Sequence, residues 1–184
     1  DYQPGHAHAD TFSFELYING RPVIVDTGTS TYVVNNTRFY ERSTAAHNTV
    51  VVCGQNSSQV WAAHRVARRA RVQVFCDEEE RIVAVHDGYK RLGCLHTRKV
   101  EKVGKYIRIT DEVDREGTAY LHFMPKENVV LDGNRLLGSD YCIEFDGARE
   151  IEPFTSMYSP EFNKREERRS FRMSFDRRLE TIIQ

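Results

Sequence analysis

Residues 12–25 read FSFELYINGRPVIV, and this stretch decides the fold class. Large apolar residues alternate with polar or amphipathic ones from 12 to 17, which is the two-residue period of a half-buried strand. Asn19-Gly20 has the composition of a tight hairpin turn, and residues 22–25 return as the partner strand. The stretch therefore predicts a β-hairpin near the start of the chain.

Short strands separated by turn signals continue to the end of the sequence. Further strands are predicted at 49–53, 66–75, 81–86, 95–100, 106–110, 119–123 and 141–145, with one or two more in 170–183. Asp-Gly or Glu-Gly pairs mark turns between several of them. Few windows have an apolar stripe of helical period. We therefore predict an all-β chain that folds as an antiparallel β-sandwich, with residues 1–184 forming one domain.

Composition places the chain among soluble globular proteins. Apolar residues make up 40% and charged residues 29% of the 184 residues, with a net charge of −1. Apolar runs are only a few residues long, so no membrane-spanning segment is expected. The sequence starts at Asp1 without a leader, which indicates a mature or excised chain. The four cysteines form no CxxC pair, so free thiols are preferred to the alternative of one or two disulfides.

Basic residues gather in two stretches, around 64–71 and 164–178. Solvated strand faces and turns would explain them without any special function. Alternatively, arginine forks in a groove would match the carboxylate or sulfate oxygens of an acidic sugar chain. A nucleic-acid partner is not expected, because no recognised binding motif accompanies the basic residues.

Three short motifs carry groups that could bind a metal ion. They are GHAHAD at 5–10, VDTG at 25–28 and STAAHNT at 43–49. Two histidines at i and i+2 of a strand would point to one face, and Asp26 and His47 could reach the same spot. Histidine and carboxylate ligands suit zinc. An HxH motif alone is weak, and spacing does not establish that the three motifs meet.

A cupin-like metal enzyme is the nearest rival that also has an HxH motif on a β fold. That motif requires a glutamate four or five residues after the second histidine. Phe12 and Ser13 occupy those positions, and the nearest glutamate is Glu15. The cupin interpretation is therefore disfavoured.

Longer matches resemble the C-terminal domain of heparinase II/III-like polysaccharide lyases. The opening run GHAHADTFSFELYINGRPVIVDTG is followed by RFYERSTAAHNTVVV, GQNSSQVW, HDGYKRLGCLHTRKV, ITDEV and YSPEFNKREE, so the resemblance covers nearly the whole chain. It implies a supersandwich-like β fold and β-elimination of uronic-acid glycans of glycosaminoglycan or alginate type. It also implies an N-terminal α/α toroid with the main catalytic tyrosine, which lies outside this sequence. The isolated chain is therefore expected to be nearly inactive.

The resemblance also assigns site residues. His8, Asp26 and His47 match the ligands of one structural zinc ion, and His6 matches a histidine that meets the acidic group of the substrate. Tyr32 and Tyr40 both lie where relatives place a tyrosine near the scissile bond, and the register leaves the choice open. A periplasmic or secreted location, in a bacterium, is implied by the family alone.

Three further residues are candidate substrate contacts. Trp61 and Arg65 could stack on a sugar face, although a core tryptophan is equally consistent with the sequence. His96, like His86 and His122, matches a family position, but each of these could instead be a hydrogen-bonded strand histidine. A non-catalytic carbohydrate-binding or structural module is the alternative to a lyase domain.

Overall fold

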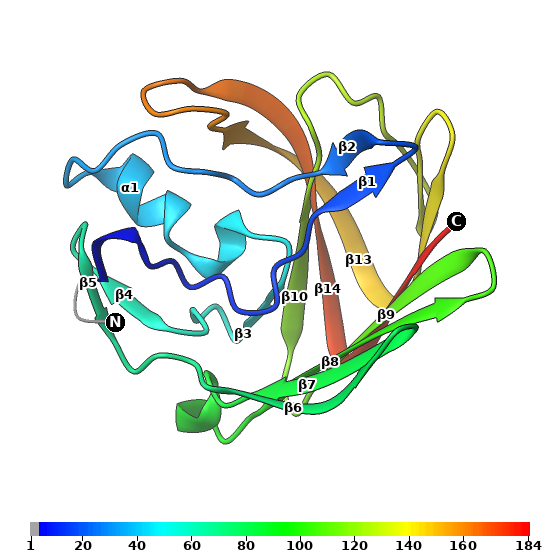
Figure 1. Cartoon of the computed structure of the whole chain (residues 1–184), viewed down its shortest axis with the longest axis horizontal. Coiled ribbons are helices and arrows are strands. Elements are labelled where there is room, and N and C mark those ends of the chain that lie inside the picture. Colours follow the sequence, from blue (N-terminus) through cyan, green and yellow to red (C-terminus); the bar gives the residue numbers. More distant parts are fainter. Residues whose placement is uncertain (1–3) are drawn as a thin grey trace.

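Antiparallel strands form two connected layers in the computed structural model, which describes residues 4–184 (Figure 1). In spatial order the large sheet contains β11 (Val130–Asp132), β12 (Arg135–Leu137), β13 (Cys142–Tyr158), β14 (Glu166–Ile183), β9 (Tyr106–Val113), β8 (His96–Val103), β7 (Arg81–His86) and β6 (Val72–Glu78), while β10 (Gly117–His122) pairs with β14 and with β3 (Val50–Val52). The predicted antiparallel β-sandwich is confirmed.

Two long strands belong to both layers. The first part of β14 pairs with β10, from Gly117↔Phe175 to His122↔Ser170, and its second part pairs with β9. The β13 register shifts between Asp146 and Glu150, where the strand changes layer. Gly147 lies at this bend with φ of 89°, and a Cβ there would be 2.5 Å from the Arg178 carbonyl oxygen. A bulge at a left-handed glycine thus folds one ribbon into two layers.

The core lies between the layers and consists of aliphatic and aromatic side chains. Its largest fully buried apolar members are Tyr89, Phe123, Phe145, Phe171, Phe175, Ile24, Leu136, Ile143, Met173 and Leu179. Each such side chain contributes about 1.5–3 kcal/mol when it leaves water. The burial on β14 alternates over much of its length, as expected for a strand with one face in the core.

The N-terminal third lies at one end of the sandwich (blue to cyan in Figure 1). The predicted hairpin is present as β1 (Leu16–Ile18) and β2 (Arg21–Ile24), and Asn19 and Gly20 both have positive φ as its turn requires. The strand predicted over 12–16 is wrong in its first part. Phe12 has φ of 68° in a turn, because its ring packs against two buried histidines, His86 and His96.

Several short elements complete this end of the molecule. They are α1 (Asn36–Glu41), the 3-10 turns η1 (Pro4–His6), η2 (Thr44–Ala46) and η3 (Lys90–Leu92), and the hairpin of β4 (Gln59–Trp61) and β5 (Arg65–Ala67). Among the described residues no helix has the length and apolarity to cross a membrane. All four cysteines are free thiols.

Candidate functional site

The segment that carries His6 and His8 is a loop, so the prediction that the two histidines share a strand face is wrong. After η1 the chain is held at Ala9, which is fully buried and whose N–H donates to the Arg42 carbonyl over 2.9 Å. The two imidazoles therefore have separate surroundings, and His6 is exposed while His8 is half-buried.

Two buried arginines, Arg38 within α1 and Arg42 at its C-cap, hold this loop. Arg38 and Arg42 are four residues apart, so their side chains leave the helix on one face. Arg38 Nη2 donates to the Gly5 carbonyl (2.6 Å) and Arg42 Nε donates to the Ala7 carbonyl (3.0 Å). The carbonyl groups of Gly5 and Ala7 thus gain charge-assisted bonds, which are about twice as strong as neutral ones. The sequence alone did not identify these arginines.

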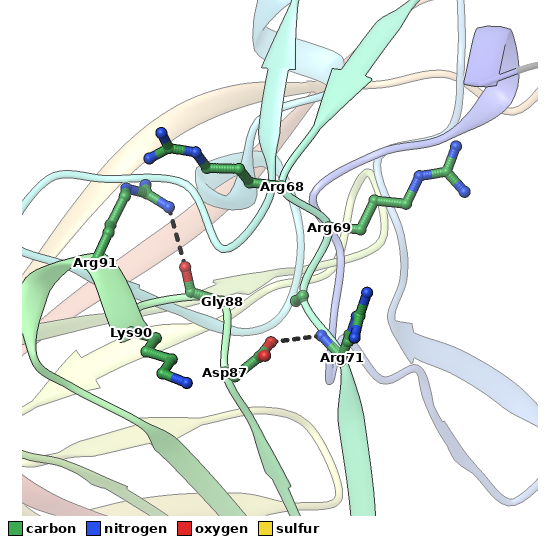
Figure 2. A pocket seen from close by; sticks show the side chains of 8 residues that line it. Arg68, Arg69, Arg71, Asp87, Gly88, Lys90 and Arg91 are labelled. Carbon is green, nitrogen blue, oxygen red and sulfur yellow. Dashed lines mark hydrogen bonds between the residues drawn. The ribbon is translucent and has the colours of Figure 1, made fainter.

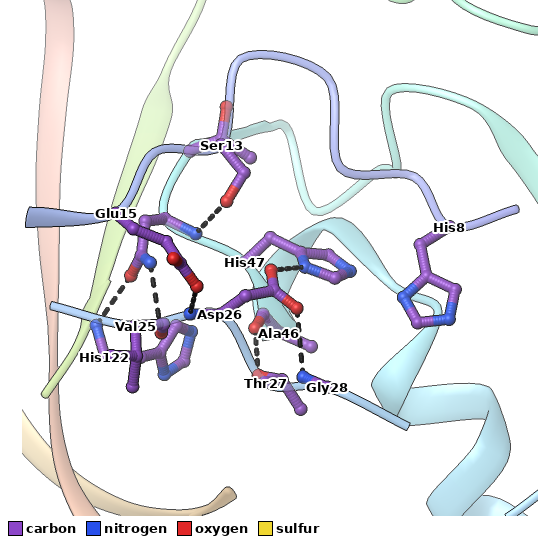
Figure 3. Close-up of polar contacts among 12 residues, drawn as sticks. His8, Ser13, Glu15, Val25, Asp26, Thr27, Gly28, Ala46, His47 and His122 are labelled. Carbon is purple, nitrogen blue, oxygen red and sulfur yellow. Dashed lines mark hydrogen bonds and ion pairs between the residues drawn. The ribbon is translucent and has the colours of Figure 1, made fainter. Parts of the chain in front are cut away.

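His8, Asp26 and His47 meet beneath the loop, as Figure 3 shows. His47 Nδ1 donates to Asp26 Oδ2 over 2.6 Å, and the centroids of the His8 and His47 rings are 5.2 Å apart. The second Asp26 oxygen accepts from the Gly28 N–H over 2.9 Å. Three motifs that lie up to 39 positions apart in the sequence (47 − 8) therefore converge at one place.

The charge states of this group suit a site that holds a cation. Burial first, then the charges of His47 and Arg38, lower the pKa of His8 to about 3, so its imidazole is neutral at pH 7. Burial alone would raise the pKa of Asp26, but the hydrogen bond and charge of His47 and the Gly28 N–H lower it to about 2. His47 Nε2 is buried and has no hydrogen-bond partner among residues 4–184.

Two residues fix the strand end that carries Asp26. The Asn48 amide donates to the carbonyls of Phe14 (2.9 Å) and Val25 (3.2 Å). Arg168 is buried and donates through Nη1 to the carbonyls of Val25 (3.0 Å) and Asp26 (3.1 Å). Arg168 is therefore structural, and neither of the two sequence-based explanations of the basic stretch 164–178, a solvated face or a glycan groove, applies to it.

His6 and Tyr32 form a second, accessible group beside the first. Tyr32 Oη and His6 Nδ1 share a hydrogen bond of 2.8 Å. The Arg38 guanidinium lies 4.8 Å from the centre of the Tyr32 ring, and the same guanidinium donates to His8 Nε2 over 3.0 Å. Phe162, which is 54% exposed, stacks on Tyr32 from the β13–β14 connection. Arg38 thus links the exposed pair to the buried group.

The sequence model of the family "Heparinase II/III-like, C-terminal" matches residues 1–183. The chain belongs to this family. A heparin-sulfate lyase from Bacteroides stercoris is 30% identical to it over 133 residues, which is 67% of this chain and 19% of that protein. The resemblance inferred from the motifs is thereby confirmed.

Solved structures show that the fold of this heparinase II/III-like domain is shared. A heparinase III aligns with a TM-score of 0.79 at 21% identity, and heparan sulfate lyase HepC from Pedobacter heparinus aligns with 0.79 at 20%. In both comparisons 97% of this chain is covered. The chain spans 30% of the length of these two proteins, so they carry further parts that this sequence does not align with.

The donor types at His8, Asp26 and His47 fit a zinc ion, since two imidazoles and a carboxylate are ligands that zinc takes. The buried, unpartnered His47 Nε2 is the atom that a metal would satisfy. Asp26 bonded to the other nitrogen of that ring orients it, as carboxylates do beside metal-binding histidines. Within residues 4–184, however, no group of three or more histidine, cysteine, aspartate or glutamate side chains has its donors arranged to hold a metal. Both Asp26 oxygens accept hydrogen bonds instead.

The structure separates the two candidate tyrosines of the heparinase II/III-like domain. Tyr40 Oη is buried with no hydrogen-bond partner among the described residues, and burial raises the pKa of Tyr40. Only Tyr32 has its hydroxyl beside an exposed histidine. Tyr40 is therefore a poor candidate for contact with a glycan.

The three predicted substrate contacts have different surroundings. Trp61 is 47% exposed with the Arg65 guanidinium 4.7 Å from its ring centre, so it is not a core tryptophan. His96 is fully buried, and its nitrogens bond to His86 (3.0 Å) and Asp111 (2.7 Å). A glycan has no access to His96, and its assignment as a substrate contact is corrected to a structural one.

Proposed function

We propose that this chain is the β-sandwich part of a lyase that cleaves uronate-containing glycans by β-elimination. The observation that carries the proposal is the exposed His6–Tyr32 hydrogen bond, placed by Arg38 beside the buried His8, Asp26 and His47. Family membership supports the reaction class, and because its relatives include a heparin-sulfate lyase and a heparan sulfate lyase, heparan sulfate is the first glycan to test.

The reaction requires a base, an acid and a group that meets the uronate carboxylate. A base removes the C5 proton, the electron pair forms the C4–C5 double bond, and the C4–O4 bond breaks with protonation of the departing oxygen. Positive or hydrogen-bonding groups at the carboxylate stabilise the charge that develops there. We assign the contact with the uronate carboxylate to His6 and a proton-transfer role to Tyr32. Because Tyr32 Oη and His6 Nδ1 share a hydrogen bond, either group can hold the proton that the other releases.

We further propose that His8, Asp26 and His47 hold one zinc ion with a structural role. When bound, the ion would fix the loop 5–10 against the end of β2 and so hold His6 in place. The support is the unpartnered His47 Nε2 and the neutral His8 imidazole. Metal analysis of protein purified without chelators should find about one equivalent. A metal-free protein whose melting temperature does not change with added zinc would contradict this proposal.

The rise in ultraviolet absorbance from the unsaturated uronate tests the function. The full-length protein should release this product from heparan sulfate or another uronate glycan, while residues 1–184 alone should be nearly inactive. Removing one member of a catalytic unit can cost nearly as much activity as removing all of it. A full-length protein that binds these glycans without forming the product would instead be a non-catalytic carbohydrate-binding module.

A further inference from the structure

A basic hollow lies where the β5–β6 connection passes the loop before η3 (Figure 2). It has a volume of about 710 Å³, and its lining comprises Arg68, Arg69, Ala70, Arg71, Asp87, Gly88, Lys90 and Arg91. A hollow of this size accommodates one or two saccharide units rather than a single ion. It shares no lining residue with the His6–Tyr32 pair.

Backbone contacts hold the walls of the hollow in place. The Arg71 N–H donates to Asp87 Oδ1 (2.7 Å), and the Asp87 N–H donates to the Arg71 carbonyl (3.2 Å). A Cβ on Gly88 would be 3.0 Å from the Cβ of Ala70, so the β5–β6 connection and the loop before η3 are in close contact. Arg68 has φ of 45°, which ends the predicted 66–75 strand and divides it into β5 and β6. The basic side chains therefore project from a defined frame.

Four of the basic side chains that line the hollow are not neutralised by a carboxylate of the residues that the structure describes. Within residues 4–184, Arg68, Arg71, Lys90 and Arg91 form no ion pair with a carboxylate. The Arg91 guanidinium donates instead to the carbonyls of Gly88 (3.0 Å) and Asn56 (2.8 Å).

Basic residues on the sheets are paired by contrast. Arg172 contacts Glu152 over 2.6 Å, Arg178 contacts Glu180, and Lys99 contacts Glu101 over 2.7 Å. Among residues 4–184, Asp87 is the only acidic residue that lines the hollow, and one of its oxygens already accepts a hydrogen bond from the Arg71 N–H. Clustered like charges repel one another, so a ligand with several negative charges would stabilise the hollow.

We propose that this hollow is a second binding site, for a saccharide segment that carries two or more sulfate or carboxylate groups. Guanidinium forks match the oxygens of either group, and the lysine adds a point charge. The preference for a multiply charged anion rests on the side chains alone, whereas the choice of a saccharide rests on the proposed function. The hollow would hold an acidic glycan through residues other than the His6–Tyr32 pair and raise the affinity for long chains.

Calorimetric titration of the 184-residue chain with a heparin tetrasaccharide and with an unsulfated uronate tetrasaccharide tests the proposal. The double variant Arg68→Gln/Lys90→Gln should weaken binding about tenfold or more, because two charged contacts are lost. The matched control is Arg172→Gln/Arg178→Gln, which removes the same charge from paired arginines and should change the affinity by less than about twofold. Melting temperatures establish that both variants are folded.

Each outcome decides between the site and a rival. The site is supported if Arg68→Gln/Lys90→Gln loses affinity and the control variant does not. The saccharide that binds with the higher affinity then identifies the anionic group that the site prefers. Equal losses in both variants, or no binding of either saccharide, would overturn it. A single-stranded polynucleotide of similar charge that competes equally would mark a general polyanion surface and also overturn it. Calorimetry does not depend on turnover, so an inactive full-length protein would refute the proposed lyase function and leave this result intact.

Discussion

At the scale of single residues, one alanine separates two histidines that differ in exposure and in hydrogen-bond partners. His6 is exposed and bonded to a phenol, whereas His8 is half-buried, neutral and held between Arg38 and the Asp26–His47 pair. The 3-10 turn at Pro4–His6 and the anchoring of Ala9 create this difference, because they break the alternation that a strand would impose.

The substitutions His6→Ala and His8→Ala should therefore fail for different reasons in the full-length protein. His6→Ala should lower the lyase rate by roughly 10²–10⁴-fold, the range for an acid–base group, and leave the metal content unchanged. His8→Ala should lose both zinc and thermal stability along with activity. Metal analysis, melting curves and initial rates on the same two preparations measure this. Release of zinc by His6→Ala would show that His6 is a ligand and that the assignment within the HxH motif is wrong.

The convergence of the three motifs could be anticipated, but the residues that arrange it could not. Nothing in the sequence marks Arg38, Arg42 or Arg168 as buried, because arginines are ordinarily exposed and these bind backbone carbonyls from distant segments. The spacing of four residues between Arg38 and Arg42 indicates a shared face of a helix, but it does not indicate burial. Phe162 was missed for a similar reason, since it reaches Tyr32 across 130 positions (162 − 32).

At the scale of elements, the bend in β13 joins the two layers. Regular turns such as Asn19-Gly20 were predictable, because their chemistry is local. The strand extents were not, since a strand at 141–145 and one or two strands within 170–183 were predicted, whereas β13 and β14 have 17 and 18 residues. The segment 148–152, which includes three charged residues, joins a strand because β14 supplies partners, which is a tertiary effect.

Gly147→Ala should destabilise the chain by about 2–4 kcal/mol, because it combines a left-handed backbone with a Cβ only 2.5 Å from the Arg178 carbonyl oxygen. Gly104→Ala is the matched control, with φ of 63° and nothing within 4 Å of the new Cβ. The control should cost about 1–2 kcal/mol from backbone strain alone. Urea unfolding of the two variants gives the comparison, and equal losses would show that the bend tolerates a side chain.

At the scale of the whole molecule, a buried ionic network connects the N-terminal loop to the large sheet. Arg98 contacts both Asp111 oxygens (2.7 and 2.8 Å) and donates to the Phe12 carbonyl (2.5 Å) and the Asn48 carbonyl (3.0 Å). His96 Nε2 bonds to the same aspartate. Fold and site are thus coupled through side chains that are buried in the sandwich.

This network predicts that stability falls as the pH falls below about 6.5. Burial first, then the charges of His96 and Arg98, lower the pKa of His86 to about 3. The unfolded chain therefore takes up the proton before the folded chain, and the stability that is complete above pH 6.5 is lost between 6.5 and 3. Each such histidine lowers the free energy of unfolding by about 1.4 kcal/mol for every pH unit of acidification in that window. Burial also lowers the pKa values of His96 and His122, so both add to the same slope.

Urea unfolding between pH 7 and pH 5, with a chelator present to remove any zinc contribution, measures the slope. The variant His86→Gln should reduce the slope of the unfolding free energy against pH by about 1.4 kcal/mol per pH unit, which corresponds to the uptake of one proton. His64→Gln, at an exposed histidine, is the control and should leave the slope unchanged. Stability that rises as the pH falls in this window would contradict the account.

The His6–Tyr32 pair is the part of this domain that we propose to take part in β-elimination. The most direct measurement is the initial rate of unsaturated-uronate formation by the full-length protein carrying Tyr32→Phe, compared with Tyr40→Phe. Tyr32→Phe removes an accessible hydroxyl bonded to His6 and should lower the rate by roughly 10²–10⁴-fold without lowering the melting temperature. Tyr40→Phe removes a buried hydroxyl that has no hydrogen-bond partner among residues 4–184, and it should keep most of the rate. A Tyr32→Phe protein that retains full activity, with the loss found in Tyr40→Phe instead, would contradict the claim.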